Sequence, residues 1–96
     1  MPELEIVVYT SSFCGACTAT LDRVRTAGEL VGDRLAWREV NVAAHPEEAE
    51  ARAIEATPTV VLVRPDGGEA MRAEGVPSLD QVLAAVAAHL PDRPGA

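Results

Sequence analysis

Cys14 and Cys17 are the residues of this chain whose type and spacing point most directly to chemistry. They are its only cysteines, and they enclose Gly15 and Ala16 in a C-x-x-C sequence. An apolar run and a polar connector precede the motif and helical spacing follows it, so we expect Cys14 to begin a helix. Unpaired backbone N–H groups and the helix dipole favour negative charge there. Cysteines in this setting have pKa values of roughly 3.5 to 7.5, which predicts an available thiolate.

The spacing of the two thiols predicts a redox pair. The fourth residue of the motif lies one helical turn behind the first, within reach of a mixed disulfide formed at the first. A structural disulfide explains the motif less well, because a loop this short constrains little chain entropy and a reducing cytosol would not maintain the bond. Two thiols suffice for a complete thiol–disulfide cycle.

Half of a zinc site and a chance occurrence are the alternatives for this motif. Structural zinc normally has four ligands, and the remaining candidates, His45 and His89, are far apart and not in a paired spacing. Both histidines fit solvated helix ends better than acid–base catalysis, because nothing near them in the sequence would tune their protonation. We therefore favour the redox dithiol and expect no metal, while both alternatives stay open.

The hydrophobic pattern predicts four strands and three helices. Continuous β-branched runs indicate buried strands, a Pro-Asp-Gly-Gly turn indicates a hairpin into a polar edge strand, and a serine–glutamine capping box begins the last helix. The expected strands are residues 4–9, 35–42, 59–64 and 69–74. The expected helices run from Cys14 to an end between Ala27 and Asp33, from Pro46 to Ile54 or Glu55, and from a Ser78 cap to Leu90.

The element order β-α-β-α-β-β-α predicts an α/β fold with a four-stranded mixed sheet and helices on both faces. Right-handed crossovers would make the first three strands parallel, and the hairpin would make the last strand antiparallel at one edge. In such a sheet, chemistry gathers beyond the carboxyl ends of the parallel strands, where the cysteines lie. The 96 residues fit a single domain, 1–96, with residues 91–96 as a loose, flexible tail.

Charge and hydropathy exclude several classes of protein. Eight basic and fifteen acidic residues give a formal net charge of −7, which repels phosphate backbones and anionic lipid. No apolar run approaches the roughly 18 residues that span a bilayer, and Glu3 and Glu5 stand where a secretory signal needs positive charge. No glycine-rich phosphate loop follows a strand. We therefore expect a soluble, cytoplasmic monomer that binds no nucleic acid, membrane or nucleotide cofactor.

Three segments give the chain a resemblance to the thioredoxin superfamily, and to its thioredoxin branch more than to the others. They are Phe13-Cys14-Gly15-Ala16-Cys17 after the first strand, Ala56-Thr57-Pro58-Thr59 at the start of the third, and Glu74-Gly75-Val76 before the last helix. The resemblance covers about residues 4–90 and lacks the additional N-terminal strand and helix of thioredoxins. It implies a thioredoxin-like fold for nearly the whole chain.

The resemblance also implies roles for individual residues. Cys14 would be the attacking thiol and Cys17 the resolving thiol. Pro58 would be a cis proline facing the pair, and the Thr57 backbone would be available to pair with an extended substrate segment. Gly75 would leave room for the substrate backbone. The implied substrate-binding residues are Phe13, Gly15, Ala16, Thr57, Pro58, Gly75 and Val76.

Departures from the family pattern concern proton transfer and redox tuning. Val8 stands six residues before the first cysteine, where thioredoxins bury an acid that assists proton transfer to and from the second cysteine. Glu39 on the neighbouring strand could replace that acid if it faces the pair. Alternation puts Glu39 on the face of Trp37 and Asn41, but the sequence does not say which face that is. Ala16 replaces the usual motif proline, which should change the reduction potential.

Reduction of protein disulfides is the favoured function, with electrons from a separate reductase such as thioredoxin reductase. The dithiol is the only redox group expected, because the chain has no flavin or nicotinamide site. A glutaredoxin-like or mycoredoxin-like reductase of low-molecular-weight thiol mixed disulfides is one alternative, suggested by residues 9–14 and 76–79. Ser11 and Ser12 count against it, because glutaredoxins usually carry a basic residue there. A binding module without turnover is the other alternative, against which the intact thiol pair argues.

Overall fold

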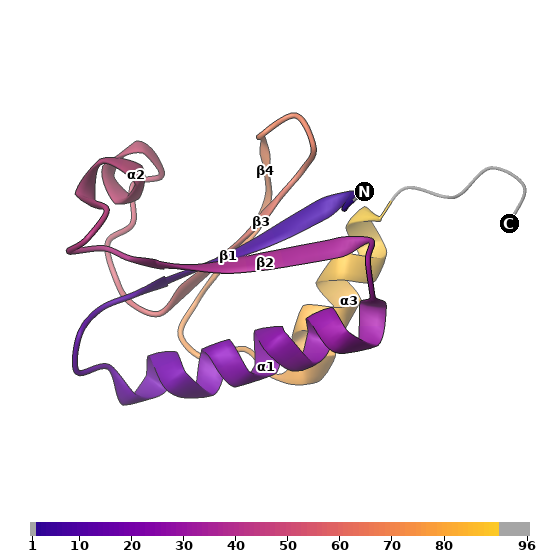
Figure 1. Ribbon diagram of the computed structural model, residues 1–96, viewed down its shortest axis with the longest axis horizontal. Coiled ribbons are helices and arrows are strands. Elements are labelled where there is room, and N and C mark those ends of the chain that lie inside the picture. The colour runs from indigo at the N-terminus through magenta and orange to yellow at the C-terminus, as the bar shows by residue number, and fades with distance from the viewer. Residues whose placement is uncertain (1, 91–96) are drawn as a thin grey trace, which may run out of the picture.

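A computed structural model describes residues 2–90 and contains a four-stranded sheet with the strand order β2-β1-β3-β4 (Figure 1). The strands are β1 (Leu4–Thr10), β2 (Leu35–Asn41), β3 (Thr59–Val63) and β4 (Glu69–Glu74). The helices are α1 (Gly15–Val31), α2 (Pro46–Ala51) and α3 (Leu79–His89). The element order and the mixed sheet confirm the predicted fold class. The expected tail, residues 91–96, lies outside the described residues.

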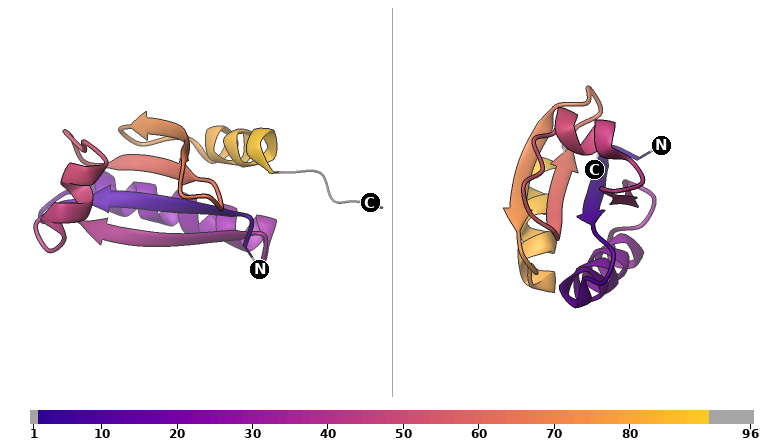
Figure 2. Two further views of the ribbon diagram at one scale, coloured as in Figure 1. Left: turned by 90° about the horizontal axis from the view of Figure 1, so that it is seen from above. Right: turned by 90° about the vertical axis from the view of Figure 1, so that its left-hand side faces the viewer.

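The central strands of the sheet are the two with the most continuous apolar sequence. Every residue of β3 is buried, and in β1 only Glu5 is partly exposed. The polar strand β4 lies at an edge, as its composition predicted, and the predicted hairpin joins it to β3 through an Arg64 N–H that donates to the Gly68 carbonyl at 2.8 Å. Figure 2 shows β2 and β4 as the outer strands.

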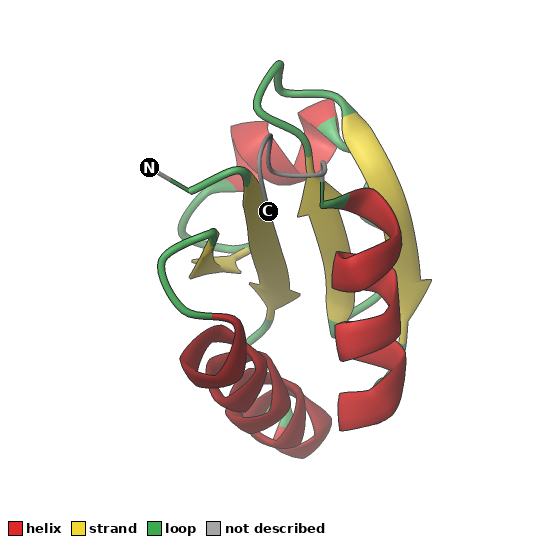
Figure 3. Cartoon of the chain, turned by 90° about the vertical axis from the view of Figure 1, so that its right-hand side faces the viewer, coloured by secondary structure: helices red, strands yellow, loops and turns green. Residues whose placement is uncertain are grey.

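The sheet separates two cores, because successive side chains of a strand point to opposite faces. On one face, which we call the helix-pair face, Ile6, Val8 and Val60 pack with Val24 of α1 and Val86 of α3. Figure 3 shows α1 and α3 lying against this face. On the other, which we call the α2 face, the core consists of Val7, Tyr9, Val40, Val61 and Val63, with Val42 and Ile54 packed against it.

The prediction that the first three strands are parallel is wrong. β1 and β2 are parallel, but β3 is antiparallel to β1, with Tyr9 opposite Thr59 and Glu5 opposite Val63. The connection from β2 to β3, residues 42–58, contains only the short helix α2, which lies at the end of the sheet where β1 and β2 finish (Figure 1). This helix does not run back along the sheet as a crossover helix would, and the chain enters β3 from that same end. This reversal brings residues 57 and 58 to the end of the sheet where the cysteines lie.

The predicted ends of α1 and α3 are confirmed. α1 passes through Gly28 and ends at Val31, where Gly32 adopts a φ of 85° and donates its N–H to the Gly28 carbonyl at 2.9 Å. Such a positive φ is reached most easily by glycine. α3 begins with the predicted capping box, in which Ser78 and Gln81 each bond the backbone of the other.

The helix α2 is shorter than predicted and ends at Ala51. Ala53 adopts a φ of 53° and donates its N–H to the Glu50 carbonyl at 3.0 Å, while the Ile54 N–H reaches the Ala49 carbonyl at 2.9 Å. These two bonds form a Schellman motif, which closes a helix when the following residue can be left-handed. Burial of Ile54 against the α2-face core accompanies this early end.

Candidate active site

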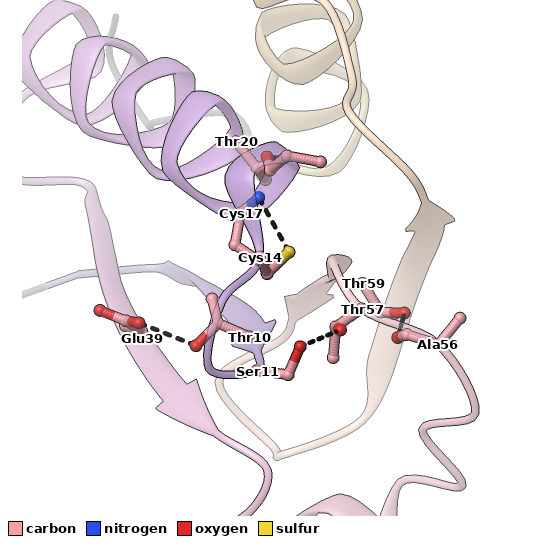
Figure 4. Close-up of a disulfide and its surroundings, with 10 residues drawn as sticks. Thr10, Ser11, Cys14, Cys17, Thr20, Glu39, Ala56, Thr57 and Thr59 are labelled. Carbon is pink, nitrogen blue, oxygen red and sulfur yellow. Dashed lines mark hydrogen bonds between the residues drawn. A yellow bond between two sulfur atoms is a disulfide. The ribbon is translucent and has the colours of Figure 1, made fainter.

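Cys14 and Cys17 form a disulfide at the N-terminus of α1, with their Cα atoms 5.3 Å apart. Cys14 is the N-cap residue, and its Sγ accepts the backbone N–H of Cys17 at 3.1 Å (Figure 4). A bond from a free helix N–H stabilises negative charge on its acceptor, so in the reduced protein this contact would favour the Cys14 thiolate. Cys14 is half-buried, whereas Cys17 is only 4% exposed. An incoming disulfide therefore has better access to Cys14.

The residues between and next to the two cysteines are exposed and small or apolar. Phe13, directly before Cys14, is fully exposed at 107% and has a φ of 61°. Val76, which follows β4, is 43% exposed. Gly15 and Ala16 lie on the outer side of the first turn of α1 and are exposed. Thr20, one turn later, donates its hydroxyl to the Ala16 carbonyl at 2.9 Å. Around the disulfide, the protein thus presents apolar contacts to solvent.

The segment before β3 contains backbone groups without hydrogen-bond partners among the described residues. The Thr57–Pro58 peptide bond is cis, and Gly75, with a φ of 86°, donates its N–H to the Pro58 carbonyl at 2.9 Å. Within residues 2–90, neither the N–H nor the C=O of Thr57 takes part in a hydrogen bond. Buried or ordered backbone groups normally find partners, so these two groups are available to an extended segment of another chain.

Two hydroxyl contacts hold the connector between β1 and α1. Thr10 donates its Oγ1 hydrogen to Glu39 Oε2 at 2.8 Å, and the Oγ atoms of Ser11 and Thr57 lie 2.7 Å apart (Figure 4). The second contact places Thr57, which precedes the cis bond, directly beside the connector that leads to Cys14. The structure therefore brings together the first two segments on which the resemblance rests.

The structure also decides the face on which Glu39 lies. Glu39 pairs with the fully buried Val8 in the β1–β2 register, and it lines a shallow depression of about 400 Å³ that includes both cysteines. The other lining residues are Thr10, Ser11, Phe13, Gly15, Thr18 and Leu21. Trp37 lies on the same face, since its Cδ1 would be 3.0 Å from a Cβ added at Gly28 in α1. Glu39 thus lies on the face of the sheet that carries α1 and lines the same depression as the cysteines, with its carboxylate bonded to Thr10.

Sequence reasoning missed the roles of Thr10, Ser11 and the Thr57 side chain. Residues 11 and 57 are 46 positions apart, and the predicted parallel strand would have placed them at opposite ends of the sheet. A cluster of hydroxyl residues directly after a buried strand was the available signal. That signal locates a polar connector but does not identify its partner.

Two residues of the α2 face, Tyr9 and Glu48, have shifted pKa values. Hydrogen bonds from Arg38, at 2.7 Å and 3.3 Å, hold the pKa of the Glu48 carboxyl below its usual range. Burial, reinforced by the Glu48 carboxylate 3.3 Å from its hydroxyl, raises the pKa of Tyr9. These groups join α2 to the sheet and do not line the depression beside the cysteines.

Residues 2–90 offer little support for metal binding or for acid–base catalysis by histidine. No group of three or more His, Cys, Asp or Glu side chains in this part of the chain is placed to hold a metal ion. His89 contacts the Ala85 carbonyl within its own helix at 2.9 Å, and His45 is exposed before α2. Among the same residues, no helix has the length and apolar character needed to cross a membrane.

Comparison with known proteins identifies one family. The Thioredoxin family model matches residues 2–88. A chloroplastic thioredoxin z is 23% identical, with 88% of this chain and 76% of that chain covered and a TM-score of 0.79. A mutant thioredoxin from Halobacterium salinarum NRC-1 is 20% identical, with 97% and 80% covered and a TM-score of 0.84. Thioredoxin-2, a component of malaria parasite protein secretion machinery, is 17% identical, with 90% and 82% covered and a TM-score of 0.83.

At these identities the solved structures show a shared fold. No curated protein matches the sequence.

Proposed function

Given that the chain belongs to the thioredoxin family and carries a disulfide in its C-x-x-C motif, we propose that it is a thiol–disulfide oxidoreductase that reduces protein disulfides. The Cys14 thiolate attacks one sulfur of a substrate disulfide, forms a mixed disulfide and releases the other sulfur as a thiolate. The Cys17 thiolate then attacks Cys14 Sγ, which releases the second substrate thiolate. The substrate gains two electrons, and the chain is left in the disulfide form seen here.

The difference in exposure between the two sulfurs carries the assignment of their roles. Cys14 is accessible and accepts a helix N–H, whereas Cys17 is almost completely covered. Access and thiolate stabilisation both favour attack through the outer residue. A polypeptide substrate is supported by the Thr57 backbone, which has no hydrogen-bond partner in the described part of the chain, by the buried Pro58 and by the exposed Phe13 and Val76.

Glu39 is proposed to take the proton from the Cys17 thiol during resolution. Its carboxylate lines the same depression as Cys17 and is held there by the Thr10 hydroxyl. Val8 leaves the more usual position without a carboxylate, and within residues 2–90 Glu39 is the only carboxylate that lines the depression. The Glu39→Gln variant, which keeps size and hydrogen bonding, should slow resolution by about a hundredfold, the lower end of general-base effects.

Stopped-flow measurement of mixed-disulfide decay across pH tests this role. A resolution rate that is reduced in the variant and recovers at high pH, where the Cys17 thiol ionises without assistance, supports Glu39 as the proton acceptor. An unchanged resolution rate contradicts it without affecting the roles of the cysteines.

Electrostatics disfavour the alternative substrate, a low-molecular-weight thiol with free carboxylates. No arginine lines the depression around the cysteines, and the arginines of residues 2–90 all bond elsewhere, as Arg38 does with Glu48 and Arg72 with Glu69. Glu39 instead adds negative charge. A carboxylated thiol such as glutathione would therefore meet repulsion where it needs a cationic partner.

The proposed cellular setting follows from the chemistry. Each cycle ends in the oxidised form, so a separate reductase such as thioredoxin reductase must return two electrons. A reducing cytoplasm is the compartment in which this cycle would run toward substrate reduction. The net charge of −7 supports a monomer that avoids nucleic acid and anionic membranes.

Two parallel assays test the proposal. Insulin reduction, with electrons from a thioredoxin reductase, is expected to be fast. Reduction of hydroxyethyl disulfide by glutathione or mycothiol is expected to be slow. Activity in the second assay alone would replace the proposal with the glutaredoxin-like or mycoredoxin-like function. Inactivity in both, with slow alkylation of Cys14, would favour a binding module.

A further inference from the structure

We propose that the side-chain bond between Ser11 and Thr57 is a positioning device that sets the Thr57 backbone edge against the reactive sulfur, and that Ser11 is thereby a specificity residue for polypeptide substrates. The inference rests on the proposed function and concerns residues that the cysteine chemistry does not use. The two oxygens lie 2.7 Å apart and join segments that are 46 positions apart in the sequence.

Ser11 and Thr57 lie just beyond the point where the sheet stops holding their segments together. The β1–β3 ladder ends at the pair Tyr9 and Thr59. Past this pair, no backbone hydrogen bond within residues 2–90 joins residues 11–14 to residues 54–58. The two hydroxyls therefore provide the direct polar link between the segment that carries the attacking sulfur and the segment that would hold the substrate.

The link matters because a polypeptide substrate must contact both segments at once. Its sulfur has to meet Cys14 while its backbone pairs with Thr57, whose N–H and C=O find no hydrogen-bond partner among residues 2–90. Without the Ser11 contact, the Thr57 segment would have to be ordered when the substrate binds, and that ordering weakens binding. A small disulfide reagent meets only the sulfur and does not incur this cost. The predicted signature is thus a change in substrate affinity that small reagents do not detect.

Removal of either hydroxyl tests the device. Ser11→Ala and Thr57→Val should each raise the KM for insulin about fivefold with kcat unchanged, the loss expected for one neutral hydrogen bond. The double variant should be no worse than the worse single variant, because both changes remove the same bond. The rate of Cys14 alkylation by iodoacetamide should stay within about twofold of wild type, because an unhindered small reagent requires only the thiolate.

Matched variants separate positioning from a general loss of structure. Ser12→Ala removes a hydroxyl from an exposed neighbour outside the contact and should leave KM unchanged. Ser11→Thr and Thr57→Ser keep both hydroxyls and should retain most of the wild-type affinity.

The outcomes distinguish this inference from the function on which it rests. Additive KM changes, or a matching fall in alkylation rate and melting temperature, would overturn the positioning role. An active wild type whose variants keep the same KM would overturn it too, while leaving the proposed function intact. A wild-type protein that fails to reduce insulin would overturn both.

Discussion

Tyr9 and Thr10 are neighbours in β1, yet their side chains point to opposite faces of the sheet and bond different carboxylates. Thr10 points to the helix-pair face, where its hydroxyl bonds Glu39 beside the disulfide. Tyr9 points to the α2 face, where its hydroxyl bonds Glu48 at 3.3 Å. Both are almost completely buried, and both pair with a carboxylate. The difference is in what surrounds the carboxylate.

On the α2 face, the carboxylate is neutralised. Arg38 binds Glu48 through two nitrogens and also approaches Glu5 at 3.4 Å, so these charged side chains pair with one another. On the helix-pair face, Glu39 bonds Thr10, makes no ion pair with an arginine of residues 2–90, and lines the depression that contains the cysteines. The two polar pairs thus differ in surroundings: the Thr10–Glu39 pair lies beside the disulfide, whereas the Tyr9–Glu48 pair joins a short helix to the sheet. Changes to polar or exposed residues beside the disulfide should therefore alter activity, and changes to the ion pairs of α2 should alter stability.

Cys14→Ser should produce the largest effect on the active face. The variant lacks the attacking thiol and is expected to lose all insulin reductase activity. Its melting temperature should match that of the reduced wild-type protein, because the hydroxyl replaces a half-buried thiol of similar size. Residual turnover in an enzyme-coupled assay would contradict the assigned role.

Cys17→Ser should stop the cycle one step later. Attack through Cys14 still occurs, so the variant is expected to accumulate a mixed disulfide with protein substrates. Non-reducing electrophoresis and mass spectrometry would detect the adduct and locate it at Cys14. An adduct at another position, or none, would count against the order of attack proposed here.

Phe13→Ala tests the exposed apolar contact beside the disulfide. The side chain is fully exposed, so its removal should leave the melting temperature unchanged. Loss of aromatic contact with a bound polypeptide should raise the KM for insulin about five- to tenfold. A fall in melting temperature with an unchanged KM would show that Phe13 stabilises the fold and does not contact the substrate.

Glu48→Gln tests the α2 face through the pH dependence of stability. Arg38 lowers the pKa of Glu48 in the folded state, so the ionised carboxylate stabilises the fold at pH values above the unfolded pKa. That contribution is lost as the pH falls through the folded pKa. Because the partners are 44% and 35% exposed, the variant should lose only about 0.5 to 1 kcal/mol at neutral pH. Urea unfolding should show that the free energies of unfolding of the wild type and the variant become equal in acid.

Glu47→Gln is the matched control for this prediction. Glu47 shares the first turn of α2 but is exposed and outside the Arg38 contact. Insulin reduction should be unchanged in both variants. The prediction is contradicted if the free energies of unfolding of the wild type and Glu48→Gln differ less at neutral pH than in acid.

Ala53→Gly should have the smallest effect, and it should be stabilising. Ala53 closes α2 with a φ of 53°, a conformation that glycine adopts without the steric cost of a Cβ. The greater chain entropy of glycine in the unfolded state offsets part of the gain, which leaves about 0.5 kcal/mol. Ala51→Gly, inside the last turn of the same helix, should instead destabilise by about 0.5 to 1 kcal/mol. Thermal unfolding of the two variants would show opposite shifts.

The sequence predicted the parts of the site that depend on local patterns. The strand before Cys14, the helix after it, the Ser78 cap and the edge strand were all readable from the periodicity and composition of single segments. The direction of β3 was not, because residues 42–58 are long enough either to cross back along the sheet or to return at the same end, and their composition does not distinguish the two. The early end of α2 depended on a left-handed Ala53 that the composition did not indicate either.

The placement of two thiols one helical turn apart at the start of a helix follows from the local sequence, because spacing and helix geometry are local properties of the chain. The residues that surround those thiols depend on how distant segments pack together. The reversal of β3 brought Thr57 to Ser11, and the β1–β2 register turned Glu39 toward the depression. Both depend on which segments pair across the sheet, and that choice is made by the burial of two cores at once rather than by any single segment.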